Sequence, residues 1–327
     1  MKSAFRHQGC IYGSDAEFLA MAVQFAEEGL LRGEQVLVAT TARNLELLHD
    51  ALGADADRIE YAETAPFRRR PSQWAETLRG WARRRPGGSE GRGRAIVEPV
   101  WAGRSRREVA AWQRMEARLT VTLAGTGIWM ICPYDTRVVE AGIVEDARRI
   151  HHECVVGRVA EPSARFMAPE DLTGAQGAPP SPDRPTDMFR FEGDLVAVRR
   201  YVLERATPIL LAEDAVAMFD VAVGSVLANL LNHGADRAVV WVRPVDGRVV
   251  CTMHCDRPLG IPRPAGSGSR SPNRLDNSLR MAEQICEWLN VSSDVSGCTI
   301  ELAMPGLRSE NTGRTGSEGL NFSSLSH

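Results

Sequence analysis

The chain has 327 residues, of which 43% are hydrophobic and 25% are charged, and its net charge is −3. This length and composition can supply two ordinary cores, because domains cluster near about 100 to 150 residues. The small net charge excludes a global electrostatic attraction to nucleic acid, and the local arginine clusters are interpreted as solvated helix faces. We therefore expect no direct nucleic-acid partner.

The first half of the sequence alternates apolar runs with segments of helical spacing. Helices are predicted around residues 18–25, 45–52, 74–81, 109–119 and 144–150, and buried strands at 35–39, 58–61, 95–97 and 128–131. This alternation is typical of an α/β domain with a parallel sheet. No phosphate loop of the Gly-x-x-x-x-Gly-Lys-Ser/Thr type occurs in this half.

Several short motifs follow one another through the same region. They are Phe5-Arg6-His7-Gln8 with Tyr12 and Glu17, Gly29-Leu30 and Gly33-Glu34, the run from Glu98 to Ser105 with Glu108, Trp112 and Glu116, and Cys132-Pro133-Tyr134-Asp135-Thr136. In this order they resemble the MEDS sensory domain, a family named for sensors of methanogens and methylotrophs. The resemblance runs from about Ala4 to Val156 and implies a RecA/KaiC-like fold without a working phosphate loop. Thr120 stands where the family often has Asn.

A ligand crevice is expected in this domain, because open parallel sheets bind ligands at the carboxyl ends of their strands. Glu98, Trp101, Arg104 and a turn at 132–135 are expected at or after such ends, where they suit a planar, hydrogen-bonding metabolite. The candidate sensing residues are His7, Tyr12, Glu98, Trp101, Arg104, Glu116, Cys132, Tyr134 and Asp135. The alternative is a buried ion-pair network of Glu98, Arg104, Glu108 and Glu116 that only fixes the fold.

Residues 169–190 are expected to form a linker. They are rich in Pro and Gly and lack hydrophobic periodicity, which favours an extended chain. The expected domains are therefore 1–168 and 191–306. Residues 307–327 contain few apolar residues and are predicted to form a disordered tail.

In the second half, an apolar helix from Phe219 is predicted to stop at His233-Gly234. Strands at 238–242 and 249–253 flank residues 244–247, whose Asp-Gly pair favours a hairpin. A Gly/Ser/Pro-rich loop at 262–272 precedes a predicted helix at 280–289 and a last strand from Gly297.

Five residues along these elements, in order, carry a second resemblance: Asn229, His233, Asp256, Gly260 and Thr299. They are similar to the nucleotide site of the GHKL (HATPase_c) superfamily, in the branch of anti-sigma factor serine/threonine kinases. The resemblance covers about residues 191–305 and implies an α+β sandwich of the Bergerat type. In that family the Asn binds the nucleotide's Mg²⁺, and the Asp accepts the adenine amino group.

Three positions depart from the family's nucleotide chemistry. Ser225 replaces the catalytic Glu, Pro258 replaces a glycine of the adenine loop, and Asp276 lies where the phosphates would arrive. Loss of a general base alone removes about 10² to 10⁴ in rate. We therefore expect no catalytic residue and weak or no binding of Mg-ATP, which leaves the unknown small molecule of the first domain as the ligand.

The seven cysteines are expected to be free thiols. The spacing Cys251-x-x-His254-Cys255 is similar to a metal motif, but strand alternation puts the two thiols on one face and the imidazole on the other. Four ligands do not converge from one strand, and the other His and Cys residues have no second cluster with matching spacing. We therefore expect no metal site.

Together the two resemblances imply an actinobacterial anti-sigma regulator, a signalling protein whose second domain holds a sigma factor or an anti-sigma antagonist. Dimerisation through the sheet is usual in the resembling family. Two alternatives stay open: an active serine/threonine kinase that phosphorylates an antagonist, and a ligand-binding scaffold with no sigma partner. No run of about 18 uninterrupted apolar residues and no signal-peptide core occur, so we expect a cytoplasmic protein without a membrane partner.

Overall fold

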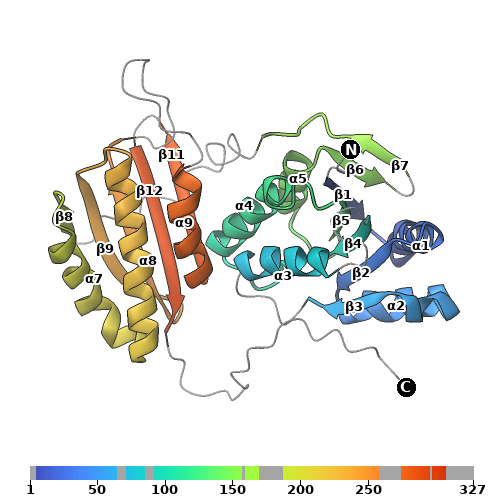
Figure 1. Cartoon of the computed structure of the whole chain (residues 1–327), viewed down its shortest axis with the longest axis horizontal. Coiled ribbons are helices and arrows are strands. Elements are labelled where there is room, and N and C mark those ends of the chain that lie inside the picture. The colour runs from blue at the N-terminus through green and yellow to red at the C-terminus, as the bar shows by residue number, and fades with distance from the viewer. Residues whose placement is uncertain are drawn as a thin grey trace. The chain divides into compact units, whose positions relative to one another are not determined.

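The computed structural model describes residues 5–64, 71–84, 92–156, 159–168, 187–257, 274–294 and 297–306. The chain divides into two compact units, one containing the described residues up to 168 and the other those from 187. Figure 1 shows the helices and strands of each unit.

The first unit contains a seven-stranded sheet in the order β3-β2-β4-β5-β1-β6-β7. The strands are β1 (Arg6–Tyr12), β2 (Gln35–Thr40), β3 (Glu60–Glu63), β4 (Gly93–Val97), β5 (Ile128–Asp135), β6 (Glu153–Val156) and β7 (Val159–Pro162). All neighbours pair in parallel except β7, which runs antiparallel to β6. The expectation of an α/β unit with a predominantly parallel sheet is confirmed.

Helices cover both faces of this sheet. Side chains of α1 (Asp15–Leu31) and α2 (Ala42–Leu52) form one core, and those of α3 (Pro71–Arg83), α4 (Arg106–Thr122) and α5 (Ala141–Ile150) form the other. A 3₁₀ helix, η1 (Gly53–Arg58), follows α2. Local sequence fixes where two helices begin, because Ser14 caps α1 and Ser105 forms a capping box with Glu108 at the start of α4.

Three boundaries in this unit differ from the sequence-based expectation. β5 continues through Asp135, so residues 132–135 are strand and not a turn after it. β3 begins at Glu60, since η1 occupies the chain up to Arg58. The motif that starts at Phe5 leads into β1, a central strand that periodicity alone did not assign.

The second unit contains a five-stranded sheet in the order β11-β12-β10-β9-β8, with antiparallel neighbours throughout. Its strands are β8 (Phe189–Phe191), β9 (Ala238–Val245), β10 (Arg248–Cys255), β11 (Trp288–Asp294) and β12 (Gly297–Pro305). The helices α7 (Leu195–Leu210), α8 (Glu213–Asn232) and α9 (Arg274–Ile285) share one core with the sheet (Figure 1). The unit is therefore a two-layer α+β arrangement, and β8 begins inside the segment that we expected to be linker.

Several expected elements of this unit are found with altered ends. The hairpin turn between β9 and β10 contains only Asp246 and Gly247, both at positive φ (50° and 72°), which the Asp-Gly pair permits. α9 begins at Arg274 and ends at Ile285, so the prediction of a helix at 280–289 was wrong at both ends. The loop expected at 262–272 lies outside the described residues.

The long apolar helix α8 ends as its sequence predicts. His233 is its C-cap, and Gly234 adopts a φ of 76°. Among the described helices, α8 alone is long and apolar enough to cross a membrane by length and composition. Its buried side chains, including Phe219, Val223 and Leu227, belong to the core of the second unit.

Candidate functional site

The carboxylate of Glu98 is the centre of one buried polar cluster in the first unit. Glu98 directly follows β4 and is 6% exposed. It accepts hydrogen bonds from the Tyr12 hydroxyl (2.8 Å), the Asn44 amide (2.8 Å) and the Thr40 hydroxyl. Tyr12 and Thr40 are the last residues of β1 and β2. The cluster therefore lies at the carboxyl ends of three parallel strands, where a ligand crevice was expected.

Burial dominates the electrostatics of this cluster. It raises the pKa of the Glu98 carboxyl, although the three donors partly oppose the rise. Burial, followed by the charge of Glu98, also raises the pKa of the Tyr12 hydroxyl far above its ordinary value. Two of these donors, Asn44 and Thr40, were not predicted as site residues, because neither belongs to a sequence motif.

Asp135 lies at the edge of this cluster. Its carboxylate accepts a bidentate ion pair from Arg137, with an Nε–Oδ1 distance of 2.8 Å and an Nη2–Oδ2 distance of 2.8 Å. Arg137 also donates to Asp15 at 2.8 Å. This pairing ties the end of β5 to the start of α1.

A second buried cluster lies on the opposite face of the same sheet, under α4 and α5. It contains His7 of β1, Glu116 of α4, Cys132 of β5 and His151, which caps α5. The Nε2 atom of His7 is 3.3 Å from the Cys132 thiol and 3.1 Å from Nε2 of His151. Nε2 of His151 is 3.6 Å from Oε1 of Glu116. All four side chains are at most 4% exposed.

Burial shifts every titratable group of this second cluster toward its neutral form. It raises the pKa of Glu116 to about 7, with the neighbouring Tyr134 and Cys132 side chains offsetting part of the rise. Burial lowers the pKa of His151 to about 4 and that of His7 well below its ordinary value. It also raises the pKa of the Cys132 thiol. The cluster is therefore neutral near pH 7 apart from Glu116.

Aromatic side chains enclose the second cluster. Trp101 stacks on Tyr134 with ring centroids 5.9 Å apart, and Tyr134 meets His151 edge-on at 5.9 Å. Arg104 lies over the ring of Trp112 at 4.1 Å and donates to the Val100 carbonyl. Arg104 is half-buried, so it is not the exposed guanidinium of an open crevice.

The structure therefore divides the nine predicted sensing residues between the two faces of one sheet. Tyr12, Glu98 and Asp135 lie on the side of α1 and α2, while the other six lie on the side of α3, α4 and α5. Glu98 and Glu116 are in different clusters, so the single ion-pair network considered from sequence is not formed. His151, Asn44 and Thr40 are the cluster members that sequence reasoning missed.

In the second unit, the predicted nucleotide-site residues are only partly brought together. Nδ1 of His254 is 2.9 Å from the Thr299 hydroxyl, and Nε2 of His254 is 3.5 Å from the largely exposed Asp256 carboxylate. His254 was not predicted to be part of a nucleotide site. Asn229 is fully buried in α8, whereas Ser225, one turn earlier, is half-buried.

The turn after β10 lies beside the end of α8, because the Arg257 guanidinium donates to the Gly234 carbonyl at 3.0 Å. His233 is next to that carbonyl, and burial lowers the pKa of its imidazole. Pro258 and Gly260 lie outside the described residues. Asp276 lies within α9 and not before it.

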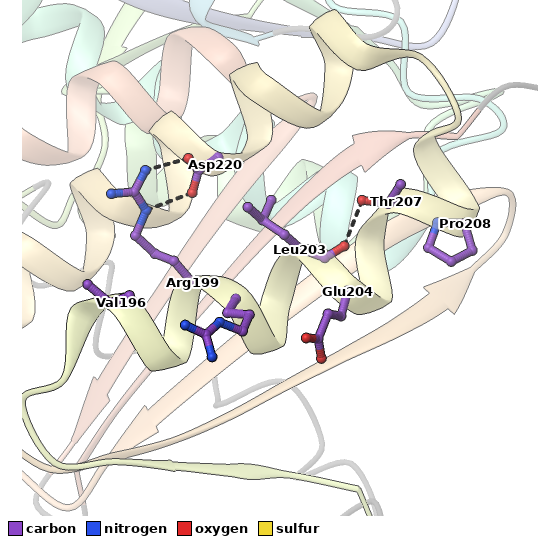
Figure 2. A pocket seen from close by; sticks show the side chains of 8 residues that line it. Val196, Arg199, Leu203, Glu204, Thr207, Pro208 and Asp220 are labelled. Atoms are coloured by element: carbon purple, nitrogen blue, oxygen red, sulfur yellow. Dashed lines mark hydrogen bonds and ion pairs between the residues drawn. The ribbon is translucent and has the colours of Figure 1, made fainter.

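A pocket of about 680 Å³ runs along α7 and α8, and Figure 2 shows its lining side chains. Arg199 of α7 forms a bidentate ion pair with Asp220 of α8 at one end, with an Nε–Oδ1 distance of 2.7 Å. Val196, Leu203 and Pro208 supply apolar lining. None of the predicted site residues lines this pocket.

Comparison with known families identifies the first unit. Residues 6–152 match the family described as MEthanogen/methylotroph, DcmR Sensory domain (MEDS). The chain contains a MEDS domain. Both buried clusters fall within it. The resemblance to the MEDS family read from the motifs is thus confirmed for this segment.

Two further comparisons used curated proteins and solved structures. No curated protein matches the chain. A solved structure described as the RsbU and RsbW domains of Rv1364c from Mycobacterium tuberculosis matches at 18% identity and a TM-score of 0.27. The match covers 40% of this chain and 35% of that one. A similarity this weak supports no conclusion about fold or function.

Proposed function

We propose that the protein is a cytoplasmic signalling regulator whose MEDS domain senses a small molecule and whose second unit binds a sigma factor or an anti-sigma antagonist. The observation that carries the proposal is the match of residues 6–152 to a sensory family, with a buried carboxylate cluster at the strand ends of that domain. The second unit enters through the ordered residues that resemble a degenerate GHKL anti-sigma domain. Its two-layer α+β architecture is compatible with that resemblance.

The metabolite would bind beside Glu98. Its carboxylate and the Tyr12 hydroxyl and Asn44 amide around it offer both donors and acceptors in a buried setting. A ligand that replaced one of these internal bonds would gain a strong hydrogen bond, because the low local dielectric strengthens such contacts. This chemistry suits a small, polar, uncharged molecule or a cation.

Native mass spectrometry of the full chain, purified from its own cells without denaturation, tests this site. We expect a bound small molecule on the wild type and a loss of at least about tenfold in occupancy for Glu98→Gln, equal to about 1.4 kcal/mol. The matched control is Glu46→Gln, an exposed carboxylate on α2, which should retain the molecule. Equal occupancy in all three proteins, or no bound molecule on the wild type, would exclude the proposed sensing site.

The second unit would act through partner binding more than through phosphoryl transfer. Ser225 lacks the carboxylate that polarises the attacking hydroxyl in the resembling kinases, and Asn229 is fully buried. The sensed ligand can then control partner binding only if its affinity differs between the partner-free and partner-bound protein. A difference of about 1.4 kcal/mol in its binding free energy changes the partner's affinity tenfold.

Isothermal titration with Mg-ATP separates this role from the kinase alternative, which the retained Asn229 and Asp256 favour. We expect weak or undetectable binding; a dissociation constant in the low micromolar range or tighter would favour the kinase. Incubation with radiolabelled ATP and a captured antagonist should likewise give little label. Ser225→Glu alone should not restore transfer, because the adenine loop is altered too.

Affinity capture of the full chain from lysate, with identification of the bound proteins, tests the partner class. A sigma factor or an anti-sigma antagonist among them supports the regulator, and its release on addition of the metabolite supports the coupling. Capture of neither, with the metabolite still bound, would leave a ligand-binding scaffold. Equilibrium sedimentation of the same preparation tests the homodimerisation that the GHKL resemblance implies.

A further inference from the structure

The second buried cluster of the MEDS domain has the composition of a metal site. His7, Glu116, Cys132 and His151 each point one ligand atom at a common centre, and these four atoms lie within 4.8 Å of one another. They come from β1, α4, β5 and the end of α5, so the tertiary fold alone assembles them. A nitrogen, nitrogen, sulfur and oxygen set of this kind is a recurrent environment of zinc and similar divalent ions.

Three of the six separations between the ligand atoms are close to the edges of a coordination tetrahedron. Bonds of about 2.0 to 2.1 Å to nitrogen and oxygen and about 2.3 Å to sulfur require edges of about 3.3 Å between the lighter atoms and about 3.6 Å to sulfur. The two Nε2 atoms are 3.1 Å apart, His7 Nε2 is 3.3 Å from the Cys132 sulfur, and His151 Nε2 is 3.6 Å from the Glu116 oxygen. All six separations are within 4.8 Å, so an ion at the centre requires the widest pairs to close by up to about 1.5 Å.

The surrounding hydrogen bonds prepare the ligand atoms. Nδ1 of His151 is 2.8 Å from the Ala147 carbonyl and donates its proton there, which leaves the Nε2 lone pair directed at the cluster. Neither carboxylate oxygen of Glu116 has a hydrogen-bond partner at normal geometry, although the residue is 2% exposed. Buried carboxylates need partners, and this one faces two imidazoles and a thiol, so its oxygens are placed to share a cation with them.

Charge balance points to the same ion. Two neutral imidazoles, one thiolate and one carboxylate carry a total charge of −2, which a divalent cation neutralises within the apolar core. The thiol and the carboxyl release their protons to solvent when the ion binds. Magnesium and calcium prefer all-oxygen sites, so the thiolate and imidazoles select a transition metal.

We propose that His7, Glu116, Cys132 and His151 bind one divalent transition-metal ion, with zinc the best fit to the geometry. The four protein ligands close the coordination shell, which is typical of structural zinc. The ion joins β1 and β5 to α4 and α5, two of the helices that cover this face of the sheet. The site lies on the opposite face from the Glu98 cluster, so the proposal stands or falls independently of metabolite sensing. It replaces the sequence-based expectation of no metal site.

Metal analysis of the full chain is the first test. The protein is expressed with zinc, dialysed against metal-free buffer and analysed by plasma mass spectrometry, and one zinc ion per chain is expected. Cobalt(II) then replaces zinc. The folded wild type should show ligand-field bands of four-coordinate cobalt together with a thiolate-to-cobalt charge-transfer band. Folded wild type that binds neither ion, or binds cobalt without the charge-transfer band, overturns the proposal.

Variants locate the ligands. Cys132→Ser should lose the charge-transfer band. His151→Asn should weaken cobalt binding by about 100-fold or more, because removing even a residue that only supports a metal ligand costs about 10- to 100-fold in affinity. The matched control is Cys10→Ser, a buried thiol on the opposite face of β1, which should keep both the band and the affinity. A band that survives in Cys132→Ser places the metal on another cysteine and refutes the site. If Cys132→Ser does not fold by circular dichroism, the wild-type cobalt spectrum decides.

Discussion

The pH dependence of stability at Glu98 is a direct consequence of its burial. Since the folded-state pKa of this carboxyl is raised above its unfolded value, the folded state holds the proton more tightly. Below an unfolded pKa of about 4.3 both states are protonated and the side chain makes its full contribution. As the pH rises above that value, the unfolded state ionises first and the free energy of unfolding falls by up to about 1.4 kcal/mol per pH unit. The fall ends once the pH passes the folded-state pKa.

Glu98→Gln removes the ionisation and keeps the shape, so the stability of the wild type relative to this variant should decline as the pH rises from about 4. Hydrogen exchange of the full chain, read by mass spectrometry on peptides of β2 and β4, measures the local opening free energy. Comparing the two proteins at the same pH cancels the intrinsic exchange rates. Glu46→Gln is the control and should give a flat difference. A difference for Glu98→Gln that is flat, or that grows with pH, would refute a raised pKa.

Three further substitutions test packing in the first and second units. Arg94→Met should cost about 3–5 kcal/mol and roughly 10 °C in the melting midpoint, since a guanidinium that is 1% exposed is removed from the Glu34 carboxylate, which is 11% exposed. In Gly9→Ala the new Cβ would lie 3.1 Å from Nδ1 of His151, so cobalt affinity should drop by about 10- to 100-fold while circular dichroism is unchanged. Phe219→Ala should destabilise the second unit by about 3–5 kcal/mol in urea titrations, whereas Val221→Ala, 44% exposed on the same helix, should stay within about 0.5 kcal/mol.

The sequence by itself determined most helices, the parallel class of the first sheet and one hairpin of the second. Apolar spacing identified α1, α4 and α8 because each buries one face against a sheet, and Asp246-Gly247 identified the hairpin because its positive φ angles favour those residues. It failed at β5, where Pro133 and the polar residues after it suggested a turn. Residues 132–135 pair in parallel with Gly9–Tyr12 of β1, and that long-range pairing overrides local turn preference.

The motifs also named most residues of both buried clusters, but only the tertiary structure decided how they are grouped. Side chains alternate between the faces of a strand, so His7 and Tyr12, five residues apart on β1, face opposite cores. Which strand lies next to β1, and which helix covers each face, depends on long-range packing that spacing does not encode. His151 meets His7 across 144 residues of sequence, and no local pattern specifies that contact. Ligands brought together by four separate elements become visible as a site only once the chain has folded.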